Sequence, residues 1–304
     1  MERDAALLLP TLTRIAEALE RLTPRPPAAI DWSQTLAAHW LVGSGGGVLA
    51  PLKTRTMRLD DLLGVERQKA TLLANTRHFL AGLPANHALL WGSRGTGKSS
   101  LVRALLHDCA GQGLRMVEVE RSHLCDLPLI IAQLRDSTHR FIIYCDDLSF
   151  AEGDPAYKVL KSVLDGSLDS ASEQVLIYAT SNRRHLLPEY FHENAETRHV
   201  GDEVHFGESV EEKVSLSERF GLWISFYPFS QDEYLHAVHS WVPLLGGRAP
   251  QSARQREAFE RDALNWALQR GSRSGRVAYQ FACDYAGRTA KAPPRPRATR
   301  RSAT

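Results

Sequence analysis

The sequence lacks any apolar run near the roughly 20 residues that a bilayer crossing requires, which argues against a membrane-spanning helix. Neither sign of charge predominates: the formal net charge is +2, so the overall composition makes no case for binding nucleic acid or membranes. The four cysteines are scattered without a C-x-x-C pair, which suits a reducing compartment. The start, Met1-Glu2-Arg3-Asp4 with a leucine run cut by Pro10, does not fit a signal peptide. We therefore expect a soluble, cytoplasmic protein with no membrane partner.

What the sequence does contain is a glycine-rich stretch that fills every fixed position of G-x-x-x-x-G-K-[ST], the Walker A motif. It lies between an apolar run at 87–91 and a helical pattern at 100–106, a context that makes a chance match a poor alternative. The glycines let backbone N–H groups turn toward a phosphate, and the following helix adds the positive end of its dipole. We expect Lys98 to reach the β and γ phosphates of ATP and the Ser99 hydroxyl to bind Mg²⁺. The expected nucleotide-binding residues of this stretch are Gly92, Ser93, Arg94, Gly95, Thr96, Gly97, Lys98, Ser99 and Ser100.

A second apolar run, at 141–145, leads directly into the paired carboxylates Asp146 and Asp147. This pattern is typical of a buried parallel strand that delivers acids to its carboxyl end, where open α/β sheets bind ligands. We expect Asp146 to hold Mg²⁺ and Asp147 to orient or deprotonate the attacking water, as in a Walker B motif. The alternative is a solvated Asp-Asp turn, which the Walker A motif about fifty residues upstream makes less attractive.

The strand expected at 175–181 also ends in small polar residues, and Asn182 is best placed to bond the attacking water or the γ-phosphate. A plain turn at the end of a strand is the alternative reading. On its own, this stretch would favour that alternative.

The rest of the chain suggests four regions. Two amphipathic helical patterns, at 5–22 and 32–41, predict an N-terminal helical extension at 1–48, which is a cap on the main domain, an autonomous module or a partner-binding arm. An α/β nucleotide-binding domain is expected at 49–228 and a helical domain at 229–289, the latter opened by the capping box Ser230-Gln231-Asp232-Glu233. The basic tail at 290–304 is expected to be disordered, and is either a polyanion-binding segment or a solvated terminus.

The polar stretch at 185–217 is longer than an ordinary connection and holds four histidines, His185, His192, His199 and His205. None of them pairs with another at helical spacing and no cysteine joins them. Solvated histidines are therefore favoured over a metal site.

The chain resembles the AAA+ ATPase superfamily, and more narrowly a family of bacterial AAA+-type ATP-binding proteins of unknown function. The stretches that carry the resemblance are 92–99, 144–150, 179–186 and 216–222, followed by the helix start Ser274-Gly275-Arg276. The likeness covers about residues 50–290. It implies a five-stranded parallel P-loop sheet with a helical lid, ATP between them, and often a ring of identical subunits.

The resemblance also assigns roles to three residues outside the phosphate loop. Asn182 matches the sensor 1 position, and Arg276 matches sensor 2, with Arg273 as the alternative. Arg219 matches the arginine finger, which acts on the ATP of a neighbouring subunit. Each arginine also has a reading as an ordinary surface or packing residue. With Lys98 and Asp147, Asn182 and Arg219 complete the expected catalytic set.

One departure from the family pattern concerns hydrolysis. The usual Walker B motif ends in Asp-Glu, whereas Asp147 is one methylene shorter, which puts fast hydrolysis in doubt. The first hypothesis is an ATPase that remodels a protein or nucleic-acid client. The second is a non-catalytic ATP switch, and a small-molecule kinase is a third.

Overall fold

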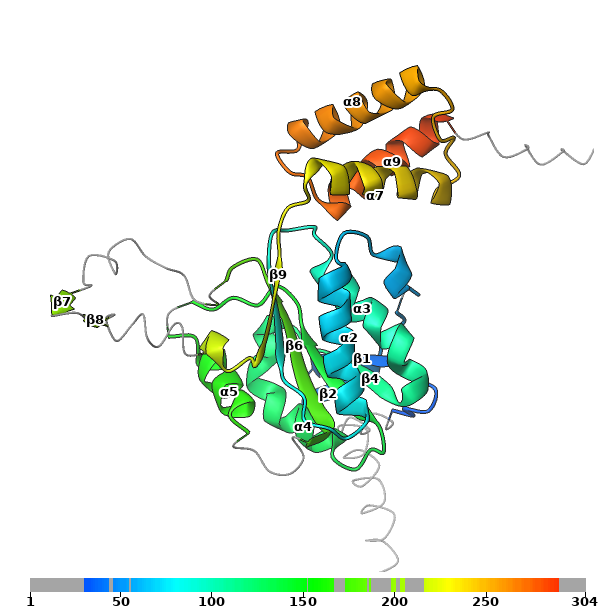
Figure 1. The fold of residues 1–304 in the computed structure, drawn as a ribbon. Helices are drawn as coiled ribbons and strands as arrows, with labels where there is room; N and C mark the ends of the chain where they lie inside the picture. Colours follow the sequence, from blue (N-terminus) through cyan, green and yellow to red (C-terminus); the bar gives the residue numbers. More distant parts are fainter. Residues whose placement is uncertain are drawn as a thin grey trace, which may run out of the picture. The chain divides into compact units, whose positions relative to one another are not determined.

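The computed structural model describes the protein in several stretches of the chain (Figure 1). They are residues 30–43, 46–54, 56–151, 153–166, 173–184, 186, 198–200, 203–205 and 216–289. The helix predicted at 5–22, the tail at 290–304 and most of the polar stretch at 185–217 lie outside them. Within that polar stretch, β7 (Arg198–Val200) and β8 (Glu203–His205) pair as an antiparallel hairpin that the sequence did not predict.

The centre of the larger unit is a seven-stranded sheet with the order β2-β1-β4-β5-β6-β3-β9. Five of its strands are those that the sequence predicts: β3 (Ala88–Gly92), β4 (Leu114–Glu118), β5 (Arg140–Cys145), β6 (Val175–Ser181) and β9 (Leu222–Phe226). The pairs β4–β5, β5–β6 and β3–β6 are parallel. These strands are near-continuous apolar runs because both faces of a parallel sheet are covered, and β6 is buried along its whole length.

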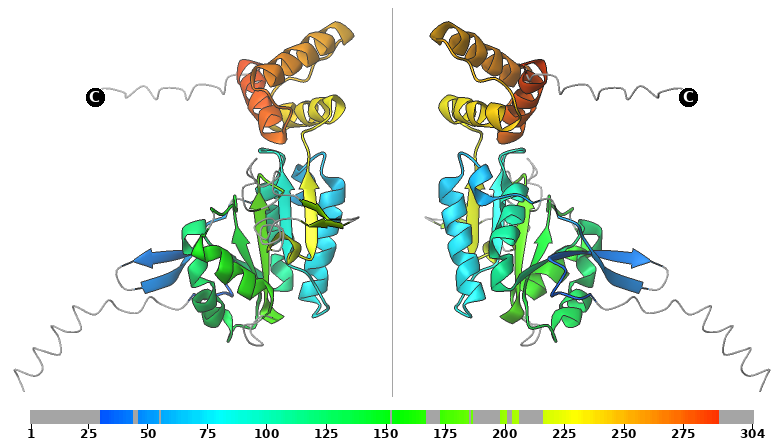
Figure 2. Two further views of the ribbon diagram at one scale, coloured as in Figure 1. Left: turned by 90° about the vertical axis from the view of Figure 1, so that its left-hand side faces the viewer. Right: turned by 90° about the vertical axis from the view of Figure 1, so that its right-hand side faces the viewer.

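The prediction of a five-stranded parallel sheet is wrong in strand number, because β1 (Ala37–Gly43) and β2 (Gly46–Pro51) extend the sheet. β1 pairs parallel to β4 and antiparallel to β2, so the sheet is mixed. The hairpin is the blue element at the edge of the sheet in Figure 2.

The helix predicted at 32–41 is also wrong, because residues 32–34 form a turn and residues 37–41 lie in β1. Trp40 lies in β1 opposite Leu49, and its indole N–H donates to Asp126 Oδ2 at 2.9 Å. A Cβ at Gly47 would lie 1.9 Å from the Trp40 ring, so the glycine makes room for the indole across the hairpin. The apolar residues of this stretch also fit the spacing of a helix. The stretch forms a strand because pairing with β4 and burial of Trp40 stabilise that conformation more.

Helices cover both faces of this sheet (Figure 2). They are α2 (Glu66–Leu80), α3 (Lys98–Cys109), α4 (Leu127–Leu134) and α5 (Pro155–Leu164). The core between the layers contains fully buried side chains from strands and helices, among them Leu89, Ile130, Ile143, Leu160 and Ile177. No described helix is both long and apolar enough to cross a bilayer.

A second compact unit contains α7 (Gln231–Leu244), α8 (Ala253–Gln269) and α9 (Gly275–Thr289), together with Asp60–Glu66 and Gly92–Lys98. Its core holds Tyr234, Phe259 and Phe281. The predicted capping box is confirmed, because Ser230 and Glu233 each bond the other's backbone N–H. The C-terminal region is therefore helical as the sequence predicts, and the phosphate-loop residues belong to this unit.

Candidate functional site

The loop at 92–98 has a backbone that requires glycine. Gly92, Gly95 and Gly97 have φ values of 129°, 76° and 104°, in the region that L side chains rarely adopt. At Gly92 a Cβ would also lie 2.0 Å from the carbonyl oxygen of Phe226, whereas at Gly97 it would meet nothing within 4 Å. Steric exclusion thus adds to backbone conformation at the first glycine but not at the third.

Lys98 lies at the start of α3 with only 6% of its surface exposed. Its ammonium donates hydrogen bonds to the carbonyl oxygens of Gly92 at 2.7 Å and Ser93 at 2.8 Å. The Thr96 hydroxyl donates to the same Ser93 carbonyl at 2.8 Å. The loop therefore folds around the lysine side chain that the Walker A pattern predicts will contact phosphate.

Ser99 and Asp146 lie next to each other although 47 positions separate them in the sequence. The Ser99 hydroxyl, on the first turn of α3, donates to Asp146 Oδ1 at 2.8 Å. Thr180, in β6, donates its hydroxyl to the same oxygen at 2.5 Å, and Arg103 Nη2 lies 3.9 Å from Asp146 Oδ2. Side chains from α3 and β6 thus converge on a carboxylate that directly follows β5.

The electrostatics of this carboxylate favour its ionised form. Burial alone would raise the pKa of Asp146, but the hydrogen bonds from Thr180 and Ser99, the nearby Tyr144 hydroxyl and the Arg103 charge outweigh burial. The net result is a pKa below the ordinary value of an aspartate. Burial and the adjacent Asp146 charge raise the pKa of Tyr144, which therefore stays neutral.

Asp147 and Asn182 are also brought together. Asp147 has a φ of 51°, the only positive value of a described residue other than glycine. Its backbone N–H donates to the Thr180 hydroxyl oxygen at 2.9 Å, and Asn182 Nδ2 donates to its carboxylate oxygen Oδ1. Asp147 is exposed and Asn182 partly exposed, so both side chains can be reached from solvent.

The three predicted arginines differ in the groups that they contact. Arg219 Nε lies 2.5 Å from Asp165 Oδ1, an ion pair within the same chain. Arg276 donates its backbone N–H to the Gly95 carbonyl at 3.0 Å, while Arg273 accepts at its carbonyl oxygen from Phe229 N–H. It is thus the main chain at Arg276 that contacts the phosphate loop.

Sequence reasoning missed three residues around Asp146, namely Thr180, Arg103 and Tyr144. The signal for Thr180 was present in the small polar residues at the end of β6, among which the sequence pattern favours Asn182. Tyr144 and Arg103 read as ordinary strand and helix residues, and only the three-dimensional arrangement reveals their neighbour.

Magnesium fits the Ser99 and Asp146 pair. Mg²⁺ takes oxygen ligands and is usually bound through one or two carboxylates with several waters. The Ser99 hydroxyl and the ionised Asp146 carboxylate, 2.8 Å apart, supply oxygen ligands of that kind. Among the described residues, no group of three or more His, Cys, Asp and Glu side chains is placed to hold a metal ion. His185 and His192 lie outside those residues.

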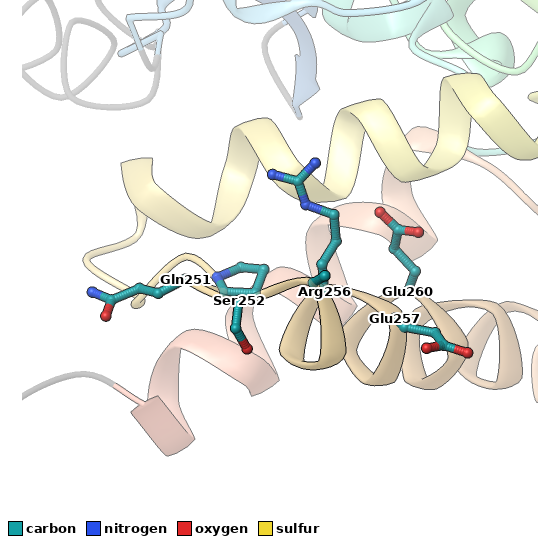
Figure 3. A pocket seen from close by; sticks show the side chains of 7 residues that line it. Gln251, Ser252, Arg256, Glu257 and Glu260 are labelled. Carbon is teal, nitrogen blue, oxygen red and sulfur yellow. The ribbon is translucent and has the colours of Figure 1, made fainter.

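A separate hollow of about 360 Å³ lies at the start of α8 (Figure 3). Arg256, Glu257 and Glu260 line it beside the Ser252 cap. Its charged side chains are explained by an exposed helix surface, and Ser252 is occupied in capping α8. The hollow therefore carries no functional assignment.

No protein with a curated function matches this chain. Among solved structures, the chain is similar to the RuvB Holliday junction branch migration motor of Thermotoga maritima, at 13% identity and a TM-score of 0.41. That match covers 77% of this chain and 72% of that one. The chain is also similar to the FIGL-1 AAA domain in complex with ADP, at 17% identity and a TM-score of 0.47, over 76% of this chain and 73% of that one.

A protein-family model matches residues 33–289, which is most of the chain. Its description is protein of unknown function, DUF815. The chain belongs to the DUF815 family.

Proposed function

We propose that this protein is an AAA+-type ATPase that binds ATP with Mg²⁺ at the loop 92–99 and hydrolyses it to ADP and phosphate. The observation that carries the proposal is the 2.8 Å hydrogen bond between Ser99 Oγ and Asp146 Oδ1. It joins the last residue of the Walker A motif to the first acid of the Walker B motif. Two sequence patterns with one expected ligand thereby meet at one point.

In this proposal the phosphates bind to the backbone N–H groups of 92–99, with Ser100 next in line, at the positive end of the α3 dipole. Lys98 exchanges its carbonyl partners for phosphate oxygens, because a charged acceptor forms the stronger hydrogen bond. Ser99 and Asp146 would hold Mg²⁺, which neutralises phosphate charge when bound. Arg94 lies exposed in the same loop and adds positive charge there.

Asp147 and Asn182 would act on the attacking water. The Asp147 carboxylate accepts the proton of the water or orients it, and the Asn182 amide fixes that carboxylate by donating to it. Because the Asp147 side chain is short and its backbone is held in a left-handed turn, its reach is limited. Slow turnover is therefore part of the proposal.

Arg219 would act in trans on the nucleotide of a neighbouring subunit in a homo-oligomer, and Arg276, rather than Arg273, would be the lid arginine. The backbone contact of Arg276 with Gly95 supports the second assignment. The client would be a protein or a nucleic acid. The two domains would be an α/β region that begins at β1, earlier than the predicted residue 49, and a helical region at 229–289. A cytoplasmic location completes the proposal.

A slow or non-catalytic ATP switch is the second candidate. The observation that favours it is the residue identity at position 147, where aspartate stands in the place of the usual glutamate. In this case nucleotide binding would control docking on a partner, and hydrolysis would contribute little.

Two measurements test the proposal and separate the candidates. ATP affinity is measured by calorimetry and phosphate release by a coupled assay, for the wild type, Lys98→Ala and Asp147→Asn. We expect Lys98→Ala to lose ATP binding, and Asp147→Asn to keep binding but lose phosphate release by about 100-fold. The matched control is Lys158→Ala, since Lys158 is exposed on α5, and it should behave as wild type.

Equal, background-level phosphate release by wild type and Lys98→Ala would eliminate the ATPase. If the wild type still bound ATP in that case, the switch would be the remaining candidate. Absence of ATP binding by the wild type would eliminate both.

A further inference from the structure

Thr180 lies between the two carboxylates of the site. It is in β6 next to Leu90 of β3, and only 1% of its surface is exposed. Its hydroxyl donates to Asp146 Oδ1 at 2.5 Å and accepts the Asp147 N–H at 2.9 Å. Its carbonyl oxygen accepts the Leu148 N–H at 2.6 Å. One residue of β6 thus bonds three consecutive residues that follow β5.

These bonds fix the direction of the Thr180 hydroxyl. A hydroxyl has one proton, and a carboxylate can only accept, so the proton points to Asp146. The lone pairs then face the Asp147 N–H, which needs an acceptor. The same group therefore holds the carboxylate of Asp146 and the backbone of Asp147 in one geometry.

The backbone at Asp147 needs such support. A φ of 51° is uncommon for a residue with a side chain and costs of order 1 kcal/mol. The bonds from Asp147 N–H and Leu148 N–H to Thr180 hold the chain in this turn. This turn places the Asp147 carboxylate where it accepts a hydrogen bond from Asn182.

We propose that Thr180 is a positioning residue of the magnesium–nucleotide site: its hydroxyl keeps the Asp146 carboxylate beside Ser99 and couples that carboxylate to the turn at Asp147. This inference rests on the proposed function, because it assumes that Ser99 and Asp146 bind Mg²⁺ with ATP. It adds a residue from a third element to the site. A purely structural role for Thr180 is the competing explanation.

The test compares variants that separate the hydroxyl from the shape of the side chain. Thr180→Val keeps the shape and removes the hydroxyl, while Thr180→Ser keeps the hydroxyl and removes the methyl group. ATP affinity is measured by calorimetry with saturating Mg²⁺ and again with excess EDTA. The ratio of the two affinities is the magnesium-dependent gain, and thermal melting checks that each variant is folded.

We expect Thr180→Val to reduce the magnesium-dependent gain about tenfold and to leave the affinity in EDTA unchanged, since one good hydrogen bond to a charged group is of that size. Thr180→Ser should recover most of the wild-type gain. Ser149→Ala is the control, since it removes a partly buried hydroxyl close in sequence to the two acids, and it should leave the gain unchanged.

A Thr180→Val variant with a lower melting temperature but the wild-type magnesium-dependent gain would overturn the proposal. If Thr180→Val does not fold, Thr180→Cys carries the same test, because its thiol is a weak donor and predicts an intermediate loss. A wild-type gain in that variant would also overturn it. Failure of the proposed function has a different signature, which is a wild type that binds no ATP in either condition; the inference would then fall with it.

Discussion

Two turns of this protein adopt left-handed backbone by different means. The loop at 92–98 uses glycines, and its first glycine lies so close to Phe226 that no side chain fits. The turn at Asp147 uses a residue with a side chain and is held by hydrogen bonds to Thr180 in a neighbouring strand. The conformation of the loop can be predicted from its own glycines, whereas the conformation of the turn depends on contacts with the neighbouring strand β6.

The comparison is tested most severely by adding a methyl group to the glycine loop. Gly92→Ala places a Cβ 2.0 Å from a backbone oxygen, and we expect a loss of more than about 3 kcal/mol in the free energy of unfolding, or no folded protein. Gly97→Ala meets no atom within 4 Å, so only its φ of 104° opposes it, and a loss of about 1–2 kcal/mol is expected. Urea unfolding of the pair checks this, and equal losses would contradict the steric account.

The phosphate loop follows β3 and the two acids follow β5. Titratable groups next to these two strands should affect the free energy of unfolding in different pH ranges. His87 precedes β3 and accepts the Ile177 N–H at Nδ1, and burial lowers its pKa to about 4. Unfolding exposes a histidine with an ordinary pKa of 6.5, so the unfolded state binds more protons below that pH. Stability should fall as pH drops from about 6.5 to 4, by at most about 3 kcal/mol, since the ring is partly exposed.

Asp146 affects the free energy of unfolding at lower pH than His87 does. Its pKa is lowered in the fold, so its stabilisation is present above the unfolded value of 3.8 and is lost as pH falls below it. Urea unfolding at about pH 7, 5, 4 and 2.5 separates the two groups, because only the last pH lies below the unfolded pKa of an aspartate. His87→Gln should flatten the curve between pH 6.5 and about 4, and a variant with the wild-type slope would show that another group titrates there.

The features that could be predicted from the sequence are those that depend on residues close together in the chain. Glycine spacing, apolar runs and the capping box at Ser230 predicted the phosphate loop, five strands and α7, because each depends on neighbouring residues. The hairpin of β1 and β2 was missed because Trp40 fits helical spacing as well, and its actual partners are in β2, β4 and at Asp126.

The contacts of Thr180 with the two acids were missed for the same reason. Only the parallel register of β5 and β6, with Cys145 opposite Ala179, brings Thr180 beside the two acids. No pattern in either strand alone predicts that contact. The pairing of Arg219 with Asp165 is equally remote in sequence and was not predicted.

The smallest expected effect concerns that pair. Both side chains are substantially exposed, at 26% and 43%, so solvent screens the interaction. Asp165→Asn should change the free energy of unfolding by less than about 1 kcal/mol. A loss of several kcal/mol in urea unfolding would show instead that the Arg219 side chain is a structural element rather than a group that acts in trans.

The central claim is that Ser99 and Asp146 form one magnesium site, and a double-mutant cycle on ATP affinity in saturating Mg²⁺ tests it most directly. We predict that Ser99→Ala and Asp146→Asn each weaken binding at least about tenfold and that the double variant binds little worse than Asp146→Asn alone, because both changes remove the same ion. Independent, additive losses, or wild-type affinity in both single variants, would contradict the account.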